Sequence, residues 1–191
     1  MPAIHTPAAA ATYRGYILRT CASDMSSWGG FVWPAEGHIA APDWKADDCC
    51  GHGLHGFLWG EGDGGLADWS LDAKWLVAGV NEWVDLTGKV KAPEAWVVHC
   101  GDRASATAFI QALGAKGAIV GGTATAGDSG TATAGYRGTA TAGDRGTVMV
   151  KWWHEPSNRY RFAIGYPGED GIKPNTAYRA DANGRLVEVQ A

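Results

Sequence analysis

An eight-residue repeat, present three times without a gap, limits what this chain can fold into more than any other feature. Residues 122–129 read GTATAGDS, residues 130–137 read GTATAGYR and residues 138–145 read GTATAGDR. Copies this similar indicate one small structural unit that stacks on itself. The octads therefore predict the architecture of the second half of the chain. They do not indicate a reaction.

Each octad separates its side chains by type. In a strand, the order Thr-Ala-Thr-Ala places both threonines on one face and both alanines on the other. We expect the alanines inside, because only methyl groups let two strand layers approach closely, and the threonines outside, where β-branched residues suit a strand face. Burying one alanine contributes less than about 1 kcal/mol. Backbone ladders and end caps must therefore supply most of the stability.

Two ways of stacking the octads remain open. An antiparallel meander would use eight residues per arm, whereas a flat solenoid would use sixteen residues per coil, with two strands in each. The turn position is occupied in order by Asp128, Tyr136 and Asp144, which alternates with a period of sixteen and favours the solenoid. Contact of Thr125 with Thr141 would support the solenoid, and contact of Thr125 with Thr133 would support the meander.

The expected fold is mainly β, in the α+β class, with a β-rich N-terminal domain, a short octapeptide β-solenoid and C-terminal β-hairpins. Its expected parts are a disordered tail (1–12), the N-terminal domain (13–114), the solenoid (115–150) and a β-hairpin cap (151–191). We expect Ile119 and Val120 to cap one end of the solenoid. The expected caps at the other end are Val148, Val150, Trp152 and Trp153.

One helix is expected within the N-terminal domain, over residues 102–113. Asp102 is its predicted N-cap and Gly114 follows its end. Its predicted buried positions are Ala104, Ala108, Phe109 and Leu113. Irregular backbone is expected over residues 43–65, which are rich in Gly, His, Cys and Asp, with a mobile loop at residues 60–65. Turns at residues 155–158 and 181–184 predict two hairpins.

Composition excludes some function classes. The formal net charge of −4 and the pI near 5.8 do not favour a grip on nucleic-acid phosphates. No apolar run reaches membrane-spanning length, and the first residues lack the pattern of a signal peptide. The chain has four cysteines, two of them adjacent at positions 49 and 50, which favours reduced thiols. These features predict a cytoplasmic protein.

A cluster of cysteine and histidine is the candidate metal site. Cys49, Cys50, His52 and His55 supply thiolate and imidazole groups of the kind that bind zinc. The spacing differs from the usual zinc patterns, which separate two close ligand pairs by a loop. A Gly-rich turn with a buried thiol and a packed histidine is therefore the favoured interpretation. No cofactor is predicted, and zinc is the alternative.

An enzymatic alternative rests on Arg14, Arg19 and His55. These residues resemble those of ADP-ribosyltransferases, whose first strand carries Arg or His and whose NAD site is built on short strands. The chain indicates no particular glutamate partner, since Glu61, Glu82 and Glu94 are all candidates. A catalytic site needs mutual geometry that the sequence does not show. A non-enzymatic protein is favoured.

The candidate binding residues lie in and after the octads. The turn residue Tyr136 and the pair Trp152 and Trp153 are candidates for protein contact, because at most one of two neighbouring strand residues points inward and exposed Trp is a typical interface anchor. The threonine rows are candidates for binding ice or ordered water: Thr123, Thr125, Thr131, Thr133, Thr139 and Thr141. The alternative is that threonine is simply a good residue on an exposed strand.

The octads resemble the shorter repeats of bacterial ice-nucleation proteins, in which Thr-x-Thr rows recur with Gly-Tyr-Gly turns. The wider layout resembles a phage and bacterial family of unknown function. The residues that carry this resemblance are WLVAGVNEWVDLTGKVKAPEAWVV (75–98), the octads, GIKPNTAYRADANGRLVEV (171–189) and the motif CGHGLH (50–55). The resemblance implies an architecture and a mobile-element setting.

From these patterns we expect a phage- or prophage-type module that binds another protein or itself. Binding would use the solenoid edge and the tryptophans that follow it. Action against a host defence system is one version of this function, and homodimerisation through an open solenoid end is another. The two alternatives are an ADP-ribosyltransferase-like enzyme and a binder of ice or ordered water.

Overall fold

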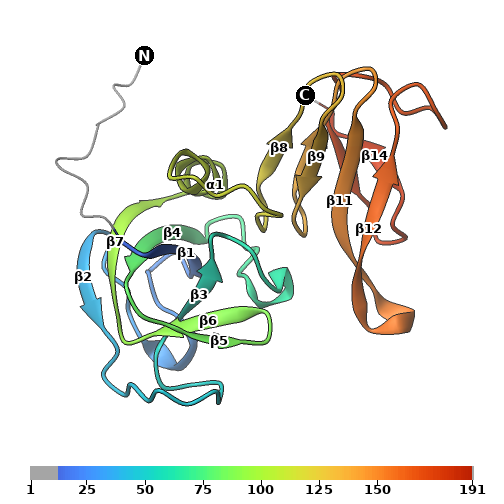
Figure 1. The fold of residues 1–191 in the computed structure, drawn as a ribbon. Coiled ribbons are helices and arrows are strands. Elements are labelled where there is room, and N and C mark those ends of the chain that lie inside the picture. Colours follow the sequence, from blue (N-terminus) through green and yellow to red (C-terminus); the bar gives the residue numbers. More distant parts are fainter. Residues whose placement is uncertain (1–12, 191) are drawn as a thin grey trace.

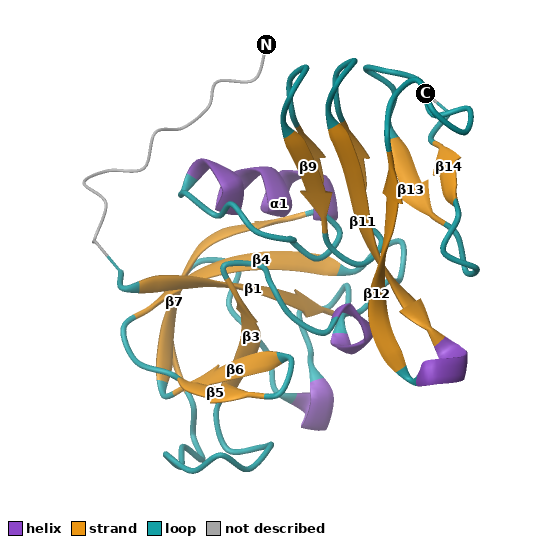
Figure 2. Cartoon of the chain, turned by 45° about the vertical axis from the view of Figure 1, so that its right-hand side comes forward, coloured by secondary structure: helices purple, strands orange, loops and turns teal. Residues whose placement is uncertain are grey.

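The computed structural model describes residues 13–190 and shows a mainly β protein with one α-helix, as the sequence predicts (Figures 1 and 2). The expected tail, residues 1–12, lies outside the described residues. The strands form a seven-stranded sheet in the N-terminal half, followed by a four-stranded and a three-stranded sheet. Within residues 13–190, no helix is both long enough and apolar enough to cross a membrane.

The N-terminal sheet is antiparallel and has the order β2-β7-β4-β1-β3-β6-β5. Its strands are β1 (Gly15–Cys21), β2 (Gly37–Ala40), β3 (Leu54–Leu58), β4 (Lys74–Val80), β5 (Val84–Leu86), β6 (Lys89–Ala92) and β7 (Glu94–Gly101). Figure 2 shows that this sheet curls strongly on itself. Strand alternation then separates two cores. Ile17 packs into one and Leu18 into the other.

Strand β3 lies within the segment for which irregular backbone was expected, so that prediction is wrong for residues 54–58. The many glycines hide the strand in the sequence. One of them, Gly56, is required by close packing, because a Cβ there would lie 2.8 Å from the Cβ of Ile17. The glycine-rich composition therefore predicts a loop, whereas the strand uses Gly56 because the sheet has no room for a side chain there.

The helix α1 (Arg103–Ala112) covers one face of the sheet and contacts β4, β7 and β1. The Asp102 carboxylate accepts a hydrogen bond from the backbone N–H of Ser105 (2.7 Å), which confirms the predicted N-cap. The predicted buried face is wrong for Ala104 and Ala108, which are exposed, whereas Phe109 and Leu113 are half-buried against the core. The helix instead buries Ala106, Thr107 and Ile110.

The octads form the predicted solenoid. Strand β8 (Thr123–Thr125) pairs in parallel with β10 (Thr139–Thr141), and β9 (Thr131–Ala134) pairs in parallel with β11 (Thr147–His154). Thr125 lies opposite Thr141, which is the register of a sixteen-residue coil. The buried cluster between the two sheets contains the octad alanines and two valines: Ala132, Ala134, Ala140, Ala142, Val148 and Val150.

Antiparallel strands close the C-terminal end of the solenoid. Strand β12 (Arg159–Gly165) pairs with β11, while β13 (Tyr178–Ala180) pairs with β10 and with β14 (Leu186–Glu188). Both predicted hairpins are present. Tyr178 is buried against the alanine core, so this ring supplies the cap that was expected from a tryptophan.

The expected caps at the N-terminal end differ as well. Ile119 and Val120 belong to the core beneath α1, where they pack with Trp75 and Ile110. They reach the solenoid through the backbone, because the N–H of Gly135 donates to the carbonyl of Ile119 (3.2 Å). These residues therefore join the two halves of the molecule. Val148 and Val150, which were expected to cap the other end of the solenoid, lie in one buried cluster with the octad alanines.

Candidate functional site

The outer face of β8 and β10 carries four octad threonines in register, which we call the Thr grid. Thr123 lies opposite Thr139 and Thr125 opposite Thr141. Neighbouring strands are about 4.8 Å apart, and alternate residues along a strand are about 6.6 Å apart. Thr123 and Thr125 are exposed, and Thr139 and Thr141 are half-buried. The grid is a small, regular array of hydroxyl and methyl groups.

The grid hydroxyls are left to the solvent. Within residues 13–190, the threonine hydroxyls that take part in hydrogen bonds to protein groups are those of Thr20, Thr107 and Thr176. None of these residues belongs to an octad. Each grid threonine therefore offers water one O–H donor, two acceptor lone pairs and a methyl group at a fixed position.

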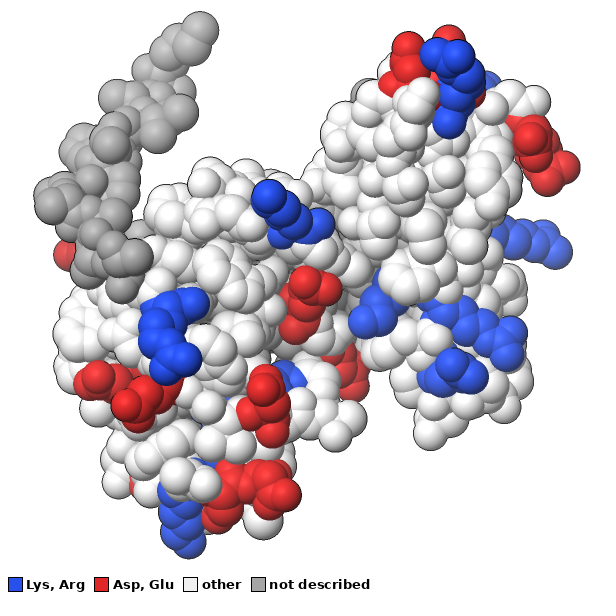
Figure 3. All heavy atoms as spheres, in the orientation of Figure 1, with Lys and Arg blue, Asp and Glu red and all other residues white. Residues whose placement is uncertain are grey.

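The outer face of β9, β11 and β12 is less regular, and we call it the opposite face. Thr131 lies opposite Thr147, but Thr133 lies opposite Met149, so the fourth octad breaks the threonine array. Strand β12 adds an exposed apolar row, the β12 stripe, beside Met149: Phe162 (40% exposed), Ile164 (49%) and Tyr166 (49%). Figure 3 shows no charged residue over the middle of the solenoid surface in that view.

The two edges of the solenoid differ, as the period of sixteen predicts. Asp128 and Asp144 lie in the turns at the end away from the N-terminal part, where the backbone N–H of Arg145 donates to the carbonyl of Asp128 (2.8 Å). Tyr136 lies at the other edge. Its carbonyl accepts a hydrogen bond from the N–H of Gly121 (2.9 Å). This places Tyr136 at the connection between the two halves.

Tyr136 is occupied by contacts within the chain. Its ring packs edge-on against Trp69 (centroids 6.0 Å apart) and Tyr160 (5.5 Å). The guanidinium of Arg137 lies 4.9 Å from the centre of the Trp69 ring. A Cβ at Gly64 would come within 2.6 Å of the Tyr136 ring, so this approach needs a glycine. The half-buried ring of Tyr136 thus anchors the solenoid to the N-terminal part.

Polar contacts complete this junction. The Tyr160 hydroxyl donates to the carboxylate of Asp63 (2.5 Å) and accepts from the N–H of Gly65 (3.0 Å). Burial, followed by the hydrogen bond to the Asp63 carboxylate, raises the pKa of Tyr160 well above its ordinary value. The segment 60–65 was expected to be a mobile loop. It instead contains the start of the 3-10 turn Gly64–Leu66. Its residues Asp63 and Gly65 form the hydrogen bonds to Tyr160.

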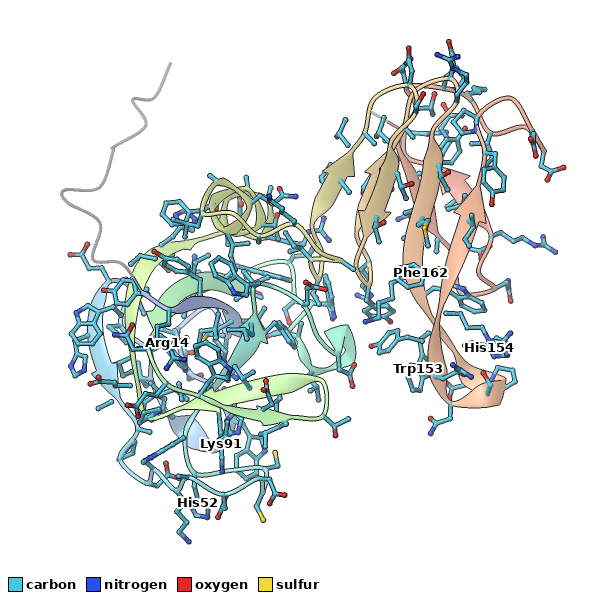
Figure 4. The ribbon with its side chains drawn as sticks, viewed as in Figure 1. Arg14, His52, Lys91, Trp153, His154 and Phe162 are labelled. Carbon is cyan, nitrogen blue, oxygen red and sulfur yellow. The ribbon has the colours of Figure 1, made fainter. Side chains whose placement is uncertain are left out.

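Trp152 and Trp153 point to opposite sides of β11, as neighbours on a strand must, and both are half-buried. Trp152 packs over Gly184, where a Cβ would come within 2.2 Å of its ring. Trp153 packs edge-on against Tyr160, and its indole N–H donates to Glu155 (2.6 Å). Neither ring lies in the alanine core. Figure 4 shows Trp153 near the hairpin tip with His154.

The four candidate zinc ligands do not form a metal site. Cys49 and Cys50 are exposed, and His52 pairs with Asp43 (3.3 Å). The Nε2 atom of His55 accepts a hydrogen bond from the N–H of Gly51 (3.4 Å). Within the described part of the chain, no three His, Cys, Asp or Glu side chains are grouped so that they could hold a metal ion.

A buried lysine holds the cysteine-rich loop in place. The ammonium of Lys91 has no solvent exposure and donates to the Asp47 carboxylate (2.6 Å), to the carbonyl of Cys49 (2.9 Å) and to that of Gly51 (3.4 Å). The bond from Lys91 lowers the pKa of Asp47. Figure 4 places Lys91 and His52 together, far from the solenoid. The motif around His52 is thus fixed by Lys91.

Arg19 and His55, which the enzymatic alternative invoked, lie side by side. The Nη1 atom of Arg19 donates to the carbonyl of His55 (3.3 Å), and both residues line a cleft of ≈ 580 Å³ that we call the Arg19 cleft. Burial, with the charges of Lys89 and Arg19 next in order, lowers the pKa of His55 to about 4. The imidazole is therefore neutral at pH 7.

The rest of that constellation is dispersed. Arg14 packs over Trp83 (5.6 Å to the ring centre) and is not among the residues that line the Arg19 cleft. Glu94 pairs with His38 (3.0 Å). The acidic residue in the cleft lining is Asp43. The structure therefore brings together Arg19 and His55 without a glutamate beside them.

Two groups of residues on these surfaces were missed from the sequence. The alternating apolar residues of 159–166 (RYRFAIGY) predict a two-sided strand, and this pattern could have indicated the β12 stripe. The aromatic lining of the Arg19 cleft comes from Trp28, Phe31 and Trp33, in the segment between β1 and β2. No local pattern joins these residues to His55. The aromatic residues follow β1 and His55 lies in β3, and the two segments meet because these strands pair in the sheet.

Comparisons with known proteins place half of this chain beside ice-nucleation proteins. The chain is 40% identical over 103 residues to an ice nucleation protein of Pseudomonas syringae, which is 52% of this chain and 9% of that protein. It is 38% identical over 98 residues to ice nucleation protein InaU of Pantoea ananas, or 49% of this chain and 10% of that protein.

An ice nucleation protein of Xanthomonas campestris pv. translucens is 37% identical over 99 residues, which is 50% of this chain and 6% of that protein. The chain thus spans a tenth or less of the length of these relatives. No family model matches the chain. No solved structure matches it.

Proposed function

We propose that the solenoid binds ordered water and ice through the Thr grid. The observation that carries this proposal is the in-register array of Thr123, Thr125, Thr139 and Thr141, whose hydroxyls form no hydrogen bond within residues 13–190. The similarity of half the chain to proteins named for ice nucleation supports it.

The grid presents its hydroxyl groups at a fixed spacing. Backbone ladders hold the strands about 4.8 Å apart, so the hydroxyls cannot spread to follow liquid water. The methyl groups limit how neighbouring waters orient. The grid itself contains no charged side chain, and the charge nearest to it on this face is Arg179 of β13, beside Thr139. An isolated molecule presents only four grid threonines. We therefore expect it to slow the growth of existing ice and not to nucleate ice alone.

The experiment compares two matched double variants by ice recrystallisation and thermal hysteresis. Thr125→Lys with Thr141→Lys places two lysines in the grid. Thr131→Lys with Thr147→Lys places the same pair, likewise one exposed and one half-buried, on the opposite face. We expect the first variant to lose the activity and the second to keep most of it. Equal loss would contradict the assignment to the grid, and an inactive wild-type protein would contradict ice binding.

The β12 stripe favours a second candidate function, which is self-association. Phe162, Ile164 and Tyr166 form an exposed apolar row that is continuous with Met149 on the opposite face. The three stripe residues carry no charge, and Lys151, which lies opposite Phe162, donates to the carbonyl of Gly62 (3.4 Å). Such a row suits a second copy of the same surface. Sedimentation velocity of Phe162→Ser with Ile164→Thr tests this. A dimer that persists in the variant, or a wild-type monomer at high concentration, would contradict it.

The phage or prophage setting and action against a host defence system also belong to this second candidate. They are supported by the resemblance of residues 75–98, the octads and residues 171–189 to a phage and bacterial family. A bacterial cytoplasmic location is proposed on the same basis. Protection of phage growth by the expressed protein in hosts with and without defence systems tests this version. Equal growth in both would contradict it.

A further inference from the structure

The Arg19 cleft lies in the N-terminal part and has no place in the ice-binding proposal. Its volume of ≈ 580 Å³ falls within the range of small-molecule sites, about 300–1,000 Å³. It is bounded by the segment that follows β1 and by the loop that Lys91 fixes. The lining residues that matter here are Arg19, Trp28, Phe31, Trp33, Asp43 and Lys89.

The cleft carries an excess of positive charge. Arg19 forms no salt bridge with any residue of 13–190, and its Nε atom is buried without a hydrogen-bond partner. Lys89 adds a second cation to the lining. The carboxylate of the lining belongs to Asp43, which is engaged by His52. The Nε atom itself is enclosed, but the charge of the Arg19 guanidinium has no carboxylate partner within residues 13–190, so an anion in the cleft would balance it.

Aromatic rings form another part of the lining. Phe31 and Trp33 meet edge-on with centroids 6.1 Å apart, and the guanidinium of Arg19 lies 5.8 Å from the centre of the Trp33 ring. Trp28 is 94% exposed, on the short turn Trp28–Gly30. An exposed tryptophan beside a cleft is a stacking platform for a planar ring. The cleft therefore combines surfaces for an anion and for a flat ring.

We propose that the Arg19 cleft binds a nucleoside monophosphate, with the phosphate at Arg19 and Lys89 and the base against Trp28. The doubly charged phosphate matches two cations, and guanidinium recognises phosphate through paired N–H donors. Asp43 and Ser27 supply polar groups in the lining that can orient the ribose or the base. A single phosphate or an uncharged nucleoside would use only half of this lining.

The test is isothermal titration of the full chain with AMP, adenosine and inorganic phosphate. We expect AMP to bind at least about tenfold more tightly than adenosine or phosphate. Trp28→Ala changes an exposed side chain and should weaken AMP binding by at least about fivefold. Arg19→Met keeps the apolar stem and should weaken it by at least about tenfold. Arg14→Gln, which removes an arginine outside the cleft lining, should leave it unchanged.

A 5′-phosphorylated oligodeoxyadenylate octamer distinguishes a free nucleotide from a nucleic-acid end. Binding of AMP alone assigns the site to free nucleotides, and equal binding of the octamer assigns it to strand ends. The proposal is overturned if AMP does not bind, or if Trp28→Ala and Arg19→Met both bind AMP as the wild type does. Because the cleft and the Thr grid are separate, Thr125→Lys with Thr141→Lys should not change AMP binding.

Discussion

The solenoid core tolerates no added volume, and one substitution tests this directly. Ala140 has no solvent exposure and lies between Ala124 of β8 and Tyr178 of β13. Replacing it with leucine adds three carbon atoms between two strand layers. If room existed, burying them would stabilise the fold by about 2.4 kcal/mol, at ~0.8 kcal/mol per methylene. The free energy of unfolding therefore rises if the core has room for leucine and falls if the core is already filled.

We expect Ala140→Leu to lower the free energy of unfolding by about 1–3 kcal/mol, the usual cost of overpacking a filled core. Thr141→Leu introduces the same side chain one residue further on, where it points outward. That variant should change stability by less than about 0.5 kcal/mol. Urea unfolding, followed by circular dichroism and tryptophan fluorescence, measures both variants. Equal effects of the two substitutions, or stabilisation by Ala140→Leu, would refute the inward placement of the alanines.

Three further predictions concern polar groups that contact buried partners or are themselves partly buried. Asp47→Asn should destabilise the fold, because the buried ammonium of Lys91 loses its carboxylate partner, and a double-mutant cycle with Lys91→Met should be non-additive. Additive losses would contradict the pairing. The pKa of His55 is lowered from 6.5 to about 4, so between these pH values the unfolded chain binds a proton that the folded protein does not. The stability that neutral His55 contributes to the fold is therefore complete above pH 6.5 and is lost as pH falls from 6.5 to 4. His55→Gln should flatten stability over that range, and an unchanged pH profile would contradict this. Tyr160→Phe should cost about 1–2 kcal/mol, because Asp63 loses one of its two donors, the other being the N–H of Gly65, and unchanged stability in urea would contradict the junction.

The octads were predictable because their information is local and repeated. The alternation of Thr and Ala fixed which side chains face inward, and the sixteen-residue period of Asp128 and Tyr136 fixed the coil. The caps were not predictable in the same way. Tyr178 fills the position expected of a tryptophan because β13 pairs with β10, a contact between segments almost forty residues apart.

The clefts and junctions depend on such distant contacts. Gly64 reads as part of a flexible acidic loop, but it is the residue that allows Tyr136 to approach. His55 reads as a metal ligand beside His52, but its imidazole accepts a hydrogen bond from Gly51 and its carbonyl accepts one from Arg19. Sequence patterns identified these residues as unusual. Their contact partners depend on the order of the strands in the sheets, which the sequence patterns did not indicate.

The most direct test of the proposed function is the incorporation of fluorescently labelled protein into a growing ice hemisphere. The wild-type protein should be enriched in the ice, and the variant with Thr131→Lys and Thr147→Lys should be enriched nearly as strongly. The variant with Thr125→Lys and Thr141→Lys should be excluded, as ordinary solutes are. Exclusion of the wild-type protein, or enrichment of all three, would contradict a role of the Thr grid in binding ice.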